Sequence, residues 1–322
     1  MLQEISVKNK NDFQKLQAGI NKYHSCSVDK VQPSSSAQIT PFAKSGIPIL
    51  IIPSLINRAT ILNLTEQNSF CKELAEAGFA PYLVDWGNPC DFAKTQDIMG
   101  YMKNILLPLL KTLPPKFLVL GYCMGGFMGL LLEKLCPARV MGYITLATPW
   151  DFSANKLKFI KQPVKEISGE QIKLMFYFSA PFDINQKFIS FAKGKFNEQE
   201  FVEIEHWVND TPDLATPVYD ECIEQFYGNN ALYNGSWHGL DARAIDKPSL
   251  VILGKKDNIT SYLSGLALHQ QLANSTLFSI ESGHIGLILN KKKITVDAIK
   301  TWCACSLPDT PSRRTSFKIS SV

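Results

Sequence analysis

Apolar runs and amphipathic stretches alternate along two parts of the chain, residues 47–146 and 249–280. The apolar runs are continuous and rich in aliphatic residues, which is typical of strands buried on both faces. Their alternation with helical periodicity predicts a doubly wound, mostly parallel sheet with right-handed crossovers. The predicted strands cover 47–52, 80–85, the run that begins at 117, 139–146, 249–253 and 276–280, and the predicted helices cover 69–77, 97–110 and 262–272.

The alternation stops between residues 150 and 240, where aromatic residues, prolines and short helical stretches replace it. We interpret this part as a cap inserted into the α/β core. Residues 31–46 are rich in Pro, Ser and Gly, which predicts a loop, and the polar tail is expected to be disordered. The expected organisation is an N-terminal arm and linker (1–46), a core in two pieces (47–150 and 241–305), a cap (151–240) and a tail (306–322).

The composition favours a globular protein over a nucleic-acid-binding or membrane-spanning one. The chain has 322 residues, 45% of them hydrophobic and 19% charged, and a net charge of +4 with both signs interspersed. This is typical of a globular protein and offers no basic surface for nucleic acid. The N-terminus lacks the apolar core of a signal peptide, and no apolar run is long enough to span a membrane. We therefore expect a soluble, cytoplasmic protein.

The eight cysteines are scattered through a chain large enough to fold without disulfides, so we expect reduced thiols. Cys303 and Cys305 are too close for a Cys-x-x-Cys pair and have no further ligands near them, so we expect no metal. No phosphate loop or dinucleotide fingerprint is present, and no bound cofactor is expected.

Cys123 lies where an apolar strand-like run breaks at glycines and resumes as a helical pattern. Gly121 and Gly125 flank it at two residues on either side. This is the arrangement of a nucleophile elbow, a strained strand-to-helix turn that projects its central side chain from the top of a sheet. The sequence therefore predicts a nucleophilic Cys123. The alternative is an inert buried thiol, because free cysteine is usually buried.

A thiol nucleophile needs a base, and the base needs an orienting group. Asp257 and His284 each follow a predicted strand directly. Because the carboxyl ends of parallel strands share one edge, both are expected beside Cys123. The order nucleophile, acid, histidine is that of the α/β-hydrolase fold, which we predict here. Less well-placed histidines are His24, His206, His238 and His269, and possible substitutes for the acid are Asp85, Asp151 and Asp183.

The oxyanion hole of this fold uses two backbone N–H groups, one from the residue after the nucleophile and one from a loop that follows a neighbouring strand. The first is predicted to be that of Met124. The second belongs to the loop after residues 47–52, where Leu55 and Ile56 are both candidates and the sequence does not choose between them.

These motifs together resemble those of the polyhydroxyalkanoate synthases, over roughly residues 45–290. The resemblance is specific because it combines a Gly-x-Cys-x-Gly-Gly box with a Leu-Ile-Asn-Arg loop. The matching stretches are residues 48–58, 82–89, 121–126, 206–210, 230–235 and 283–285.

The resemblance implies an acyltransferase that moves 3-hydroxyacyl groups from coenzyme A onto a growing polyester. Cys123 would carry the acyl chain, His284 would activate the thiol, and Asp257 would assist His284 or the incoming hydroxyl. An ordinary thiol is only a few per cent ionised at pH 7, so a base is required. The chain has the length of the short catalytic subunit of two-subunit synthases, which implies a helical partner subunit. A homodimer and a place on polyester granules are also expected.

Two other functions remain open. The same scaffold suits an intracellular polyester depolymerase or acyl thioesterase, since water can replace the alcohol acceptor. The run after Asp257, Asn-Ile-Thr-Ser, departs from the family's usual His-Ile and proline, so a granule-binding protein with a degenerate site is the third possibility. Aromatic residues of the cap either line an acyl channel or form the cap's own core: Phe176, Tyr177, Phe178, Phe182, Phe188, Phe191 and Phe196.

Overall fold

A seven-stranded sheet forms the centre of the molecule. The computed structural model describes residues 10–25, 36–154, 167–179, 181–195 and 197–307. The strand order is β1-β3-β2-β4-β5-β6-β7, and every neighbouring pair is parallel except β1 and β3. The doubly wound, mostly parallel sheet is thus confirmed. The strands are β1 (Gln38–Pro41), β2 (Ile47–Ile52), β3 (Phe79–Asp85), β4 (Phe117–Tyr122), β5 (Val140–Leu146), β6 (Ser249–Gly254) and β7 (Ser275–Ile280).

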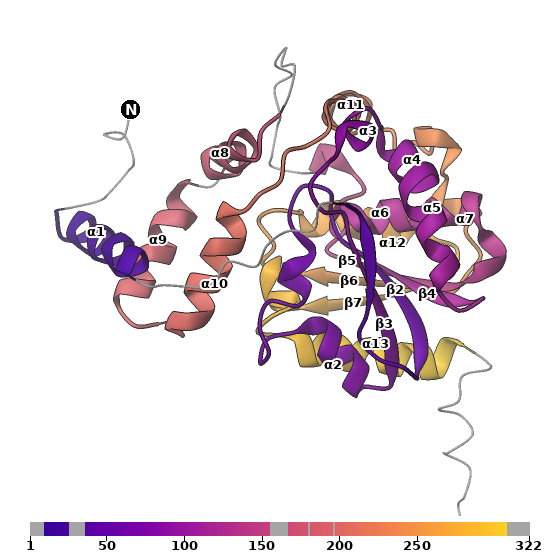
Figure 1. Ribbon diagram of the computed structural model, residues 1–322, viewed down its shortest axis with the longest axis horizontal. Coiled ribbons are helices and arrows are strands. Elements are labelled where there is room, and N and C mark those ends of the chain that lie inside the picture. The colour runs from indigo at the N-terminus through magenta and orange to yellow at the C-terminus, as the bar shows by residue number, and fades with distance from the viewer. Residues whose placement is uncertain (1–9, 26–35, 155–166, 180, 196, 308–322) are drawn as a thin grey trace, which may run out of the picture.

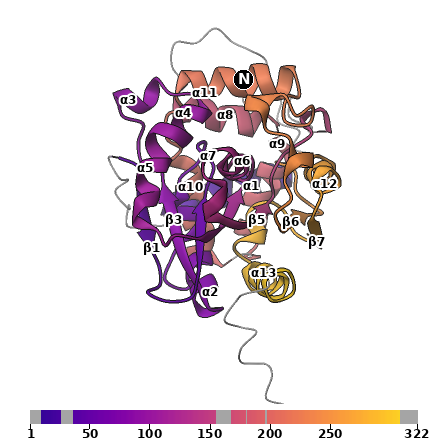
Figure 2. The same ribbon diagram turned by 90° about the vertical axis from the view of Figure 1, so that its right-hand side faces the viewer.

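Helices cover both faces of the sheet (Figures 1 and 2). Alternate residues of β2 enter different cores: Leu50 and Ile52 join one cluster, and Ile49 and Ile51 join the other. This burial on both sides explains why the strands are continuously apolar. The core helices are α2 (Phe70–Glu76), α3 (Asp91–Lys94), α4 (Ile98–Gly100), α5 (Leu107–Leu109), α6 (Met124–Leu130), α7 (Leu132–Leu135), α12 (Tyr262–Gln271) and α13 (Lys292–Ser306).

The predicted helix over 97–110 is not a single α-helix. It divides into α4, a π-helical turn over Tyr101–Leu106, α5 with Pro108, and a short 3₁₀ turn over Leu110–Thr112. A proline inside a helix has no N–H to donate and crowds the preceding turn. The helical periodicity therefore predicted the position of the segment, while the proline accounts for its irregular hydrogen bonding.

The described chain between β5 and β6 contains four α-helices. They are α8 (Gly169–Ser179), α9 (Pro181–Ala192), α10 (Glu198–Asn209) and α11 (Thr216–Glu221). A single bridge between Ile167 and Leu214 is the one β-type pairing found in the part of this insertion that the structure describes. Helices α8, α9 and α10 lie to one side of the sheet (Figure 1).

The N-terminal helix α1 (Lys10–Ser25) packs against α9, so this segment is an extension of the cap rather than a free arm (Figure 1). The two helices approach closely at Gly19, where a Cβ would lie 2.2 Å from the backbone oxygen of Phe188. Tyr23 packs on the small apolar core of the cap. The sequence analysis placed these residues in an N-terminal arm, and only the tertiary structure shows what they contact.

The predicted loop over 31–46 contains a strand, β1, that the sequence analysis missed. Strand β1 pairs antiparallel with β3, with Gln38 opposite Asp85 and Pro41 opposite Tyr82. It is a short, largely exposed edge strand that carries a proline, and such strands have little apolar signal in the sequence. At the other end, α13 extends to Ser306. The remaining tail, 308–322, lies outside the described residues, so its predicted disorder stays a prediction; residues 26–35 also lie outside them.

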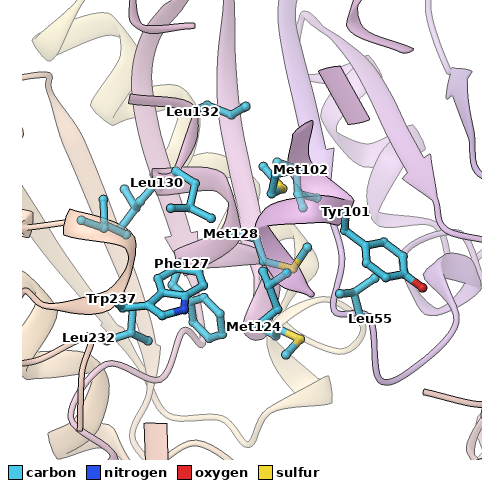
Figure 3. Close-up of a cluster of buried hydrophobic side chains, with 14 of the residues drawn as sticks. Leu55, Tyr101, Met102, Met124, Phe127, Met128, Leu130, Leu132, Leu232 and Trp237 are labelled. Carbon is cyan, nitrogen blue, oxygen red and sulfur yellow. The ribbon is translucent and has the colours of Figure 1, made fainter. Parts of the chain in front are cut away.

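Helix α6 is buried along its whole length between the sheet and the cap. Figure 3 shows Phe127 against Trp237, with ring centroids 5.4 Å apart and nearly perpendicular, while Met124 and Met128 lie toward Leu55 and Tyr101. No helix in the described ranges is long and apolar enough to cross a membrane.

Backbone contact between β4 and α6 requires glycine. A Cβ on Gly121 would lie 2.3 Å from the Gly125 oxygen, one on Gly125 would lie 1.9 Å from the Ile52 oxygen, and one on Gly126 would lie 1.8 Å from Thr148 Oγ1. The helix can begin immediately after the strand only because these side chains are absent.

We expect Gly125→Ala to lower the free energy of unfolding by about 1–3 kcal/mol, because a methyl group would overlap backbone atoms that cannot move aside. Urea denaturation of the full chain measures this. Gly283→Ala is the control: its Cβ would meet nothing closer than the Lys256 oxygen at 3.4 Å, so stability should change little. Equal stability of the two variants would contradict the close packing described here.

Candidate active site

Three elements of the sheet deliver the predicted catalytic residues to one edge. Cys123 follows β4, Asp257 follows β6 and His284 follows β7. Cys123 occupies a left-handed backbone conformation, with φ 56° and ψ −125°, and its N–H donates to the Leu146 oxygen of β5 at 2.8 Å. Such a strained conformation for a residue other than glycine is typical of a nucleophile elbow.

Asp257 holds His284 directly. One carboxylate oxygen of Asp257 lies 2.7 Å from His284 Nδ1, and both side chains are buried. The other oxygen accepts hydrogen bonds from the N–H groups of Ile259 and Thr260, at 2.8 and 2.9 Å. The departure from the family pattern after Asp257 therefore does not prevent the carboxylate from reaching the histidine.

The electrostatics of His284 favour the charged imidazolium. Burial alone would lower the pKa of His284, but the charges of Asp257 and Cys123, with hydrogen bonding to both, outweigh it and raise the pKa to about 10. An imidazolium of this kind stabilises a neighbouring thiolate.

Tyr122, which the sequence reading missed, packs against His284 with ring centroids 5.0 Å apart. Its hydroxyl lies 3.4 Å from the His284 backbone oxygen, as donor. Burial raises the pKa of Tyr122 well above its usual range, so the phenol stays neutral. Tyr122 lies on β4, directly before Cys123, and a buried aromatic residue at that place has no sequence signature beyond the strand pattern.

A cavity of about 90 Å³ opens onto Cys123 and is lined almost entirely by apolar side chains. Its polar groups include the thiols of Cys123 and Cys222 and the hydroxyl of Thr260. The π-helical segment Cys222–Gly228 supplies a large part of the wall. The cap residues that line the cavity are Phe152, Ile172, Met175, Leu214, Tyr219, Cys222, Ile223, Phe226 and Tyr227.

The aromatic residues singled out in the sequence do not form this wall where they can be placed. Phe191 stacks on Phe201 at a ring-centroid distance of 3.9 Å, and Phe188 meets Phe201 edge-on, so both belong to the cap's own core. The side chains of Phe176, Tyr177, Phe178, Phe182 and Phe196 lie outside the described residues.

The two candidate oxyanion donors of the loop after β2, Leu55 and Ile56, have different surroundings. Ile56 lines the Cys123 cavity, whereas the side chain of Leu55 is buried in the core beside Tyr101 (Figure 3). The Ile56 N–H donates to Ser54 Oγ at 3.0 Å. Met124 is the first residue of α6, and the first N–H groups of a helix have no partner within the helix.

The competing histidines have other partners. His269 Nδ1 bonds Ser275 Oγ at 2.8 Å, His206 packs near the Tyr23 ring, and His238 Nε2 lies 2.7 Å from Glu221. None of these three lines the Cys123 cavity. The side chain of His24 lies outside the described residues.

Two of the acidic residues considered as substitutes for Asp257 also have other hydrogen-bond partners. Asp151 accepts a hydrogen bond from Asn230, and Asp85 accepts one from the Gly87 N–H. The side chain of Asp183 is not among the described ones.

One group of described residues has the composition of a metal site. Ligand atoms of Asp97, Glu221 and His238 lie within 4.8 Å of one another. However, Glu221 already accepts hydrogen bonds from Trp237 Nε1 at 2.6 Å and from the Ile98 N–H at 2.8 Å. The group therefore joins the cap to α4 through hydrogen bonds. The seven described cysteines are free thiols, as expected.

Comparison with known proteins identifies the family. No protein-family model matches the chain. The chain is 30% identical over 284 residues to the poly(3-hydroxyalkanoate) polymerase subunit PhaC of Allochromatium vinosum, covering 80% of each protein. The chain belongs to the PhaC family. It is also 29% identical over 294 residues to PhaC of Thiocystis violacea, over 83% of this chain and 82% of that protein.

Solved structures support the fold of this PhaC-family chain. An esterase from Exiguobacterium antarcticum superimposes with a TM-score of 0.55 at 17% identity, over 85% of this chain and 98% of the esterase. The thioesterase domain from the curacin biosynthetic pathway gives a TM-score of 0.51 at 13% identity, over 82% of this chain and 96% of that domain. The α/β-hydrolase fold is thereby confirmed.

We expect Asp257→Asn to lower the pKa of His284 from about 10 toward its ordinary value of 6.5 or below. The amide removes the charge of Asp257, the first of the two charges that raise this pKa, while the effect of Cys123 and the burial that lowers the pKa remain. In the wild type His284 should stay protonated until the pH rises to about 10, and in the variant it should lose its proton at lower pH. Imidazole ¹⁵N chemical shifts across this pH range measure the change.

The control is Asp241→Asn, which alters an exposed carboxylate paired with Arg243 and should leave the His284 titration unchanged. A His284 midpoint that is the same in Asp257→Asn and in the wild type would show that Asp257 does not raise this pKa.

Proposed function

We propose that this protein is a polyhydroxyalkanoate synthase, an acyltransferase that moves 3-hydroxyacyl groups from coenzyme A to a growing polyester through an acyl group on Cys123. The observation that carries the proposal is the strained Cys123 at the mouth of an apolar cavity, beside the buried pair of Asp257 and His284. Membership of the PhaC family supports the same reaction.

In the acylation step, His284 holds the proton of the Cys123 thiol as an imidazolium, and the Sγ thiolate attacks the carbonyl carbon of the thioester. The carbonyl oxygen becomes an oxyanion, which the Met124 N–H and a second N–H of the loop after β2 would stabilise. Ile56 borders the cavity, but its N–H already donates to Ser54 Oγ, so the N–H groups of Leu55 and Ile56 both remain candidates for that second donor. When the carbon–sulfur bond to coenzyme A breaks, the leaving thiolate receives a proton from His284.

In the transfer step, the hydroxyl group of an acyl chain attacks the Cys123 thioester while His284 accepts its proton. The bond from the acyl carbon to Cys123 Sγ then breaks, which yields the ester and leaves the Sγ thiolate beside the His284 imidazolium, and Asp257 orients His284 throughout. A cysteine suits this sequence because one thioester replaces another, so little free energy is lost when the acyl group enters the enzyme. The apolar cavity also disfavours water as the acceptor, since it offers few hydrogen-bond partners.

A hydrolase is the second candidate. Esterases and a thioesterase domain share the fold, which supports an intracellular depolymerase or acyl thioesterase on the same residues. The two functions differ in the acceptor: an alcohol produces polymer, whereas water produces free hydroxy acid.

We further propose a helical second subunit, because the relatives are named polymerase subunits. A homodimer, a cytoplasmic location and attachment to polyester granules complete the proposal. Coenzyme A acts here as a substrate rather than as a bound cofactor.

The decisive experiment incubates the full chain with 3-hydroxybutyryl-coenzyme A, alone and with a candidate helical subunit. Chromatography measures free coenzyme A, polymer and free hydroxy acid. Polymer in proportion to released coenzyme A supports the synthase, free acid without polymer supports the hydrolase, and no turnover in either condition supports a granule-binding protein.

We expect Cys123→Ala to reduce coenzyme A release by on the order of 10³-fold or more, because no acyl-enzyme can form. Cys305→Ala, which removes an exposed thiol on α13, is the matched control and should release coenzyme A at the normal rate. Unchanged release by Cys123→Ala would remove Cys123 from the mechanism.

A further inference from the structure

Arg58 joins three stretches that are far apart in the sequence. Its guanidinium donates two hydrogen bonds to the Asp210 carboxylate, Nε to Oδ2 at 3.1 Å and Nη2 to Oδ1 at 3.3 Å. Nη2 also donates to Asn88 Oδ1 at 2.7 Å, and Nη1 donates to the Gly87 oxygen at 3.3 Å. The guanidinium thus binds the end of cap helix α10 and the turn after β3 at once.

The backbone of Arg58 is held by the same cap helix. Trp207 Nε1 donates to the Arg58 oxygen at 2.8 Å, in a buried hydrogen bond. At the other end of the loop, Trp86 Nε1 donates to the Pro53 oxygen at 3.2 Å. The loop over 54–57 therefore lies between two anchored backbone positions, and one of them depends on the cap.

This loop and the same part of the cap both reach the Cys123 cavity. Ile56, two residues before Arg58, lines the cavity, and so does Leu214, four residues after Asp210. A shift of the end of α10 relative to the core would therefore move a wall of the cavity and the loop that borders the nucleophile. The Arg58–Asp210 pair connects these two movements.

The different exposure of Arg58 and Asp210 indicates that their ion pair positions the loop more than it stabilises the fold. The side chain of Arg58 is 8% exposed, whereas that of Asp210 is 52% exposed. An ion pair that is open to water on one side contributes little to the free energy of unfolding. Arg58 also keeps Asn88 and Gly87 as acceptors when Asp210 changes. Loss of the carboxylate is thus expected to alter the position of the loop more than the stability of the fold.

We propose that Arg58 is a positioning residue that couples the docking of cap helix α10 to the placement of the 54–57 loop, so that the oxyanion hole forms only when the cap is seated. This inference rests on the proposed function, in which the loop supplies an N–H to the oxyanion. Placement of such a donor matters at a fraction of an ångström, because a donor must point at the oxygen as charge develops on it.

The test compares two reactions of the same thiol in the full chain. Acylation of Cys123 develops an oxyanion, but alkylation of Cys123 by iodoacetamide does not. Single-turnover acylation is followed with 3-hydroxybutyryl-coenzyme A and, separately, with p-nitrophenyl butyrate. The variants are Asp210→Asn, which removes the charge, and Arg58→Lys, which keeps the charge but loses the forked geometry. Asp241→Asn is the control, since it alters another Arg–Asp pair that is exposed and remote from the loop.

We expect Asp210→Asn and Arg58→Lys to slow acylation by both substrates about 10- to 100-fold, part of the loss that follows removal of an oxyanion donor. Alkylation should keep the wild-type rate, and Asp241→Asn should affect neither reaction. If the rate of alkylation decreases by the same factor as the rate of acylation, the variants disturb the site in general and the proposal is overturned. Acylation at the wild-type rate in both variants would overturn it as well.

Failure of the proposed function would look different. In that case the wild type would release p-nitrophenol from the ester but would make no polymer from the thioester, and free hydroxy acid or unreacted thioester would be found instead. The comparison of ester acylation with alkylation among the variants would still decide the role of Arg58.

Discussion

The direct contact between the backbones of β4 and α6 is the constraint on which the site depends. Three glycines without side chains allow the helix to begin one residue after the strand ends, against β2 and β5. The turn between them has room for only one residue, and that residue must adopt a positive φ. Cys123 is consequently raised above the sheet edge, next to the point between β2 and β4 where the strand order reverses.

The surroundings of that thiol divide into a polar side and an apolar side. The sheet provides the polar side, with Asp257 and His284 at the ends of two neighbouring strands and hydrogen-bonded to each other. The cap provides most of the apolar side, largely from the π-helical turn over Cys222–Gly228. Charges interact strongly in such a partly dehydrated place, which is why the imidazolium of His284 is favoured despite its burial.

The cap therefore supplies residues to the site. It contributes walls of the cavity. Its residues Trp207 and Asp210 also form hydrogen bonds with Arg58, which follows the loop after β2. Helix α1 packs against the far side of the cap on α9, so the first described residues of the chain extend the same layer. In the proposed synthase, which would admit a coenzyme A thioester and then an acyl alcohol, the position of the cap would be linked to the loop that borders Cys123.

The sequence by itself determined the features that depend on local backbone geometry and on repeating burial. The parallel strands follow from continuous aliphatic runs, and the turn at Cys123 follows from glycines two residues away on each side. The meeting of Asp257 and His284 could be predicted because parallel strands end at one edge. Only the tertiary structure decided the cavity wall at Cys222–Gly228, the link from Arg58 to Asp210, the packing of α1 on α9, and edge strand β1. These depend on contacts between segments many residues apart, or on an exposed strand without apolar alternation, and neither leaves a periodic signal in the chain.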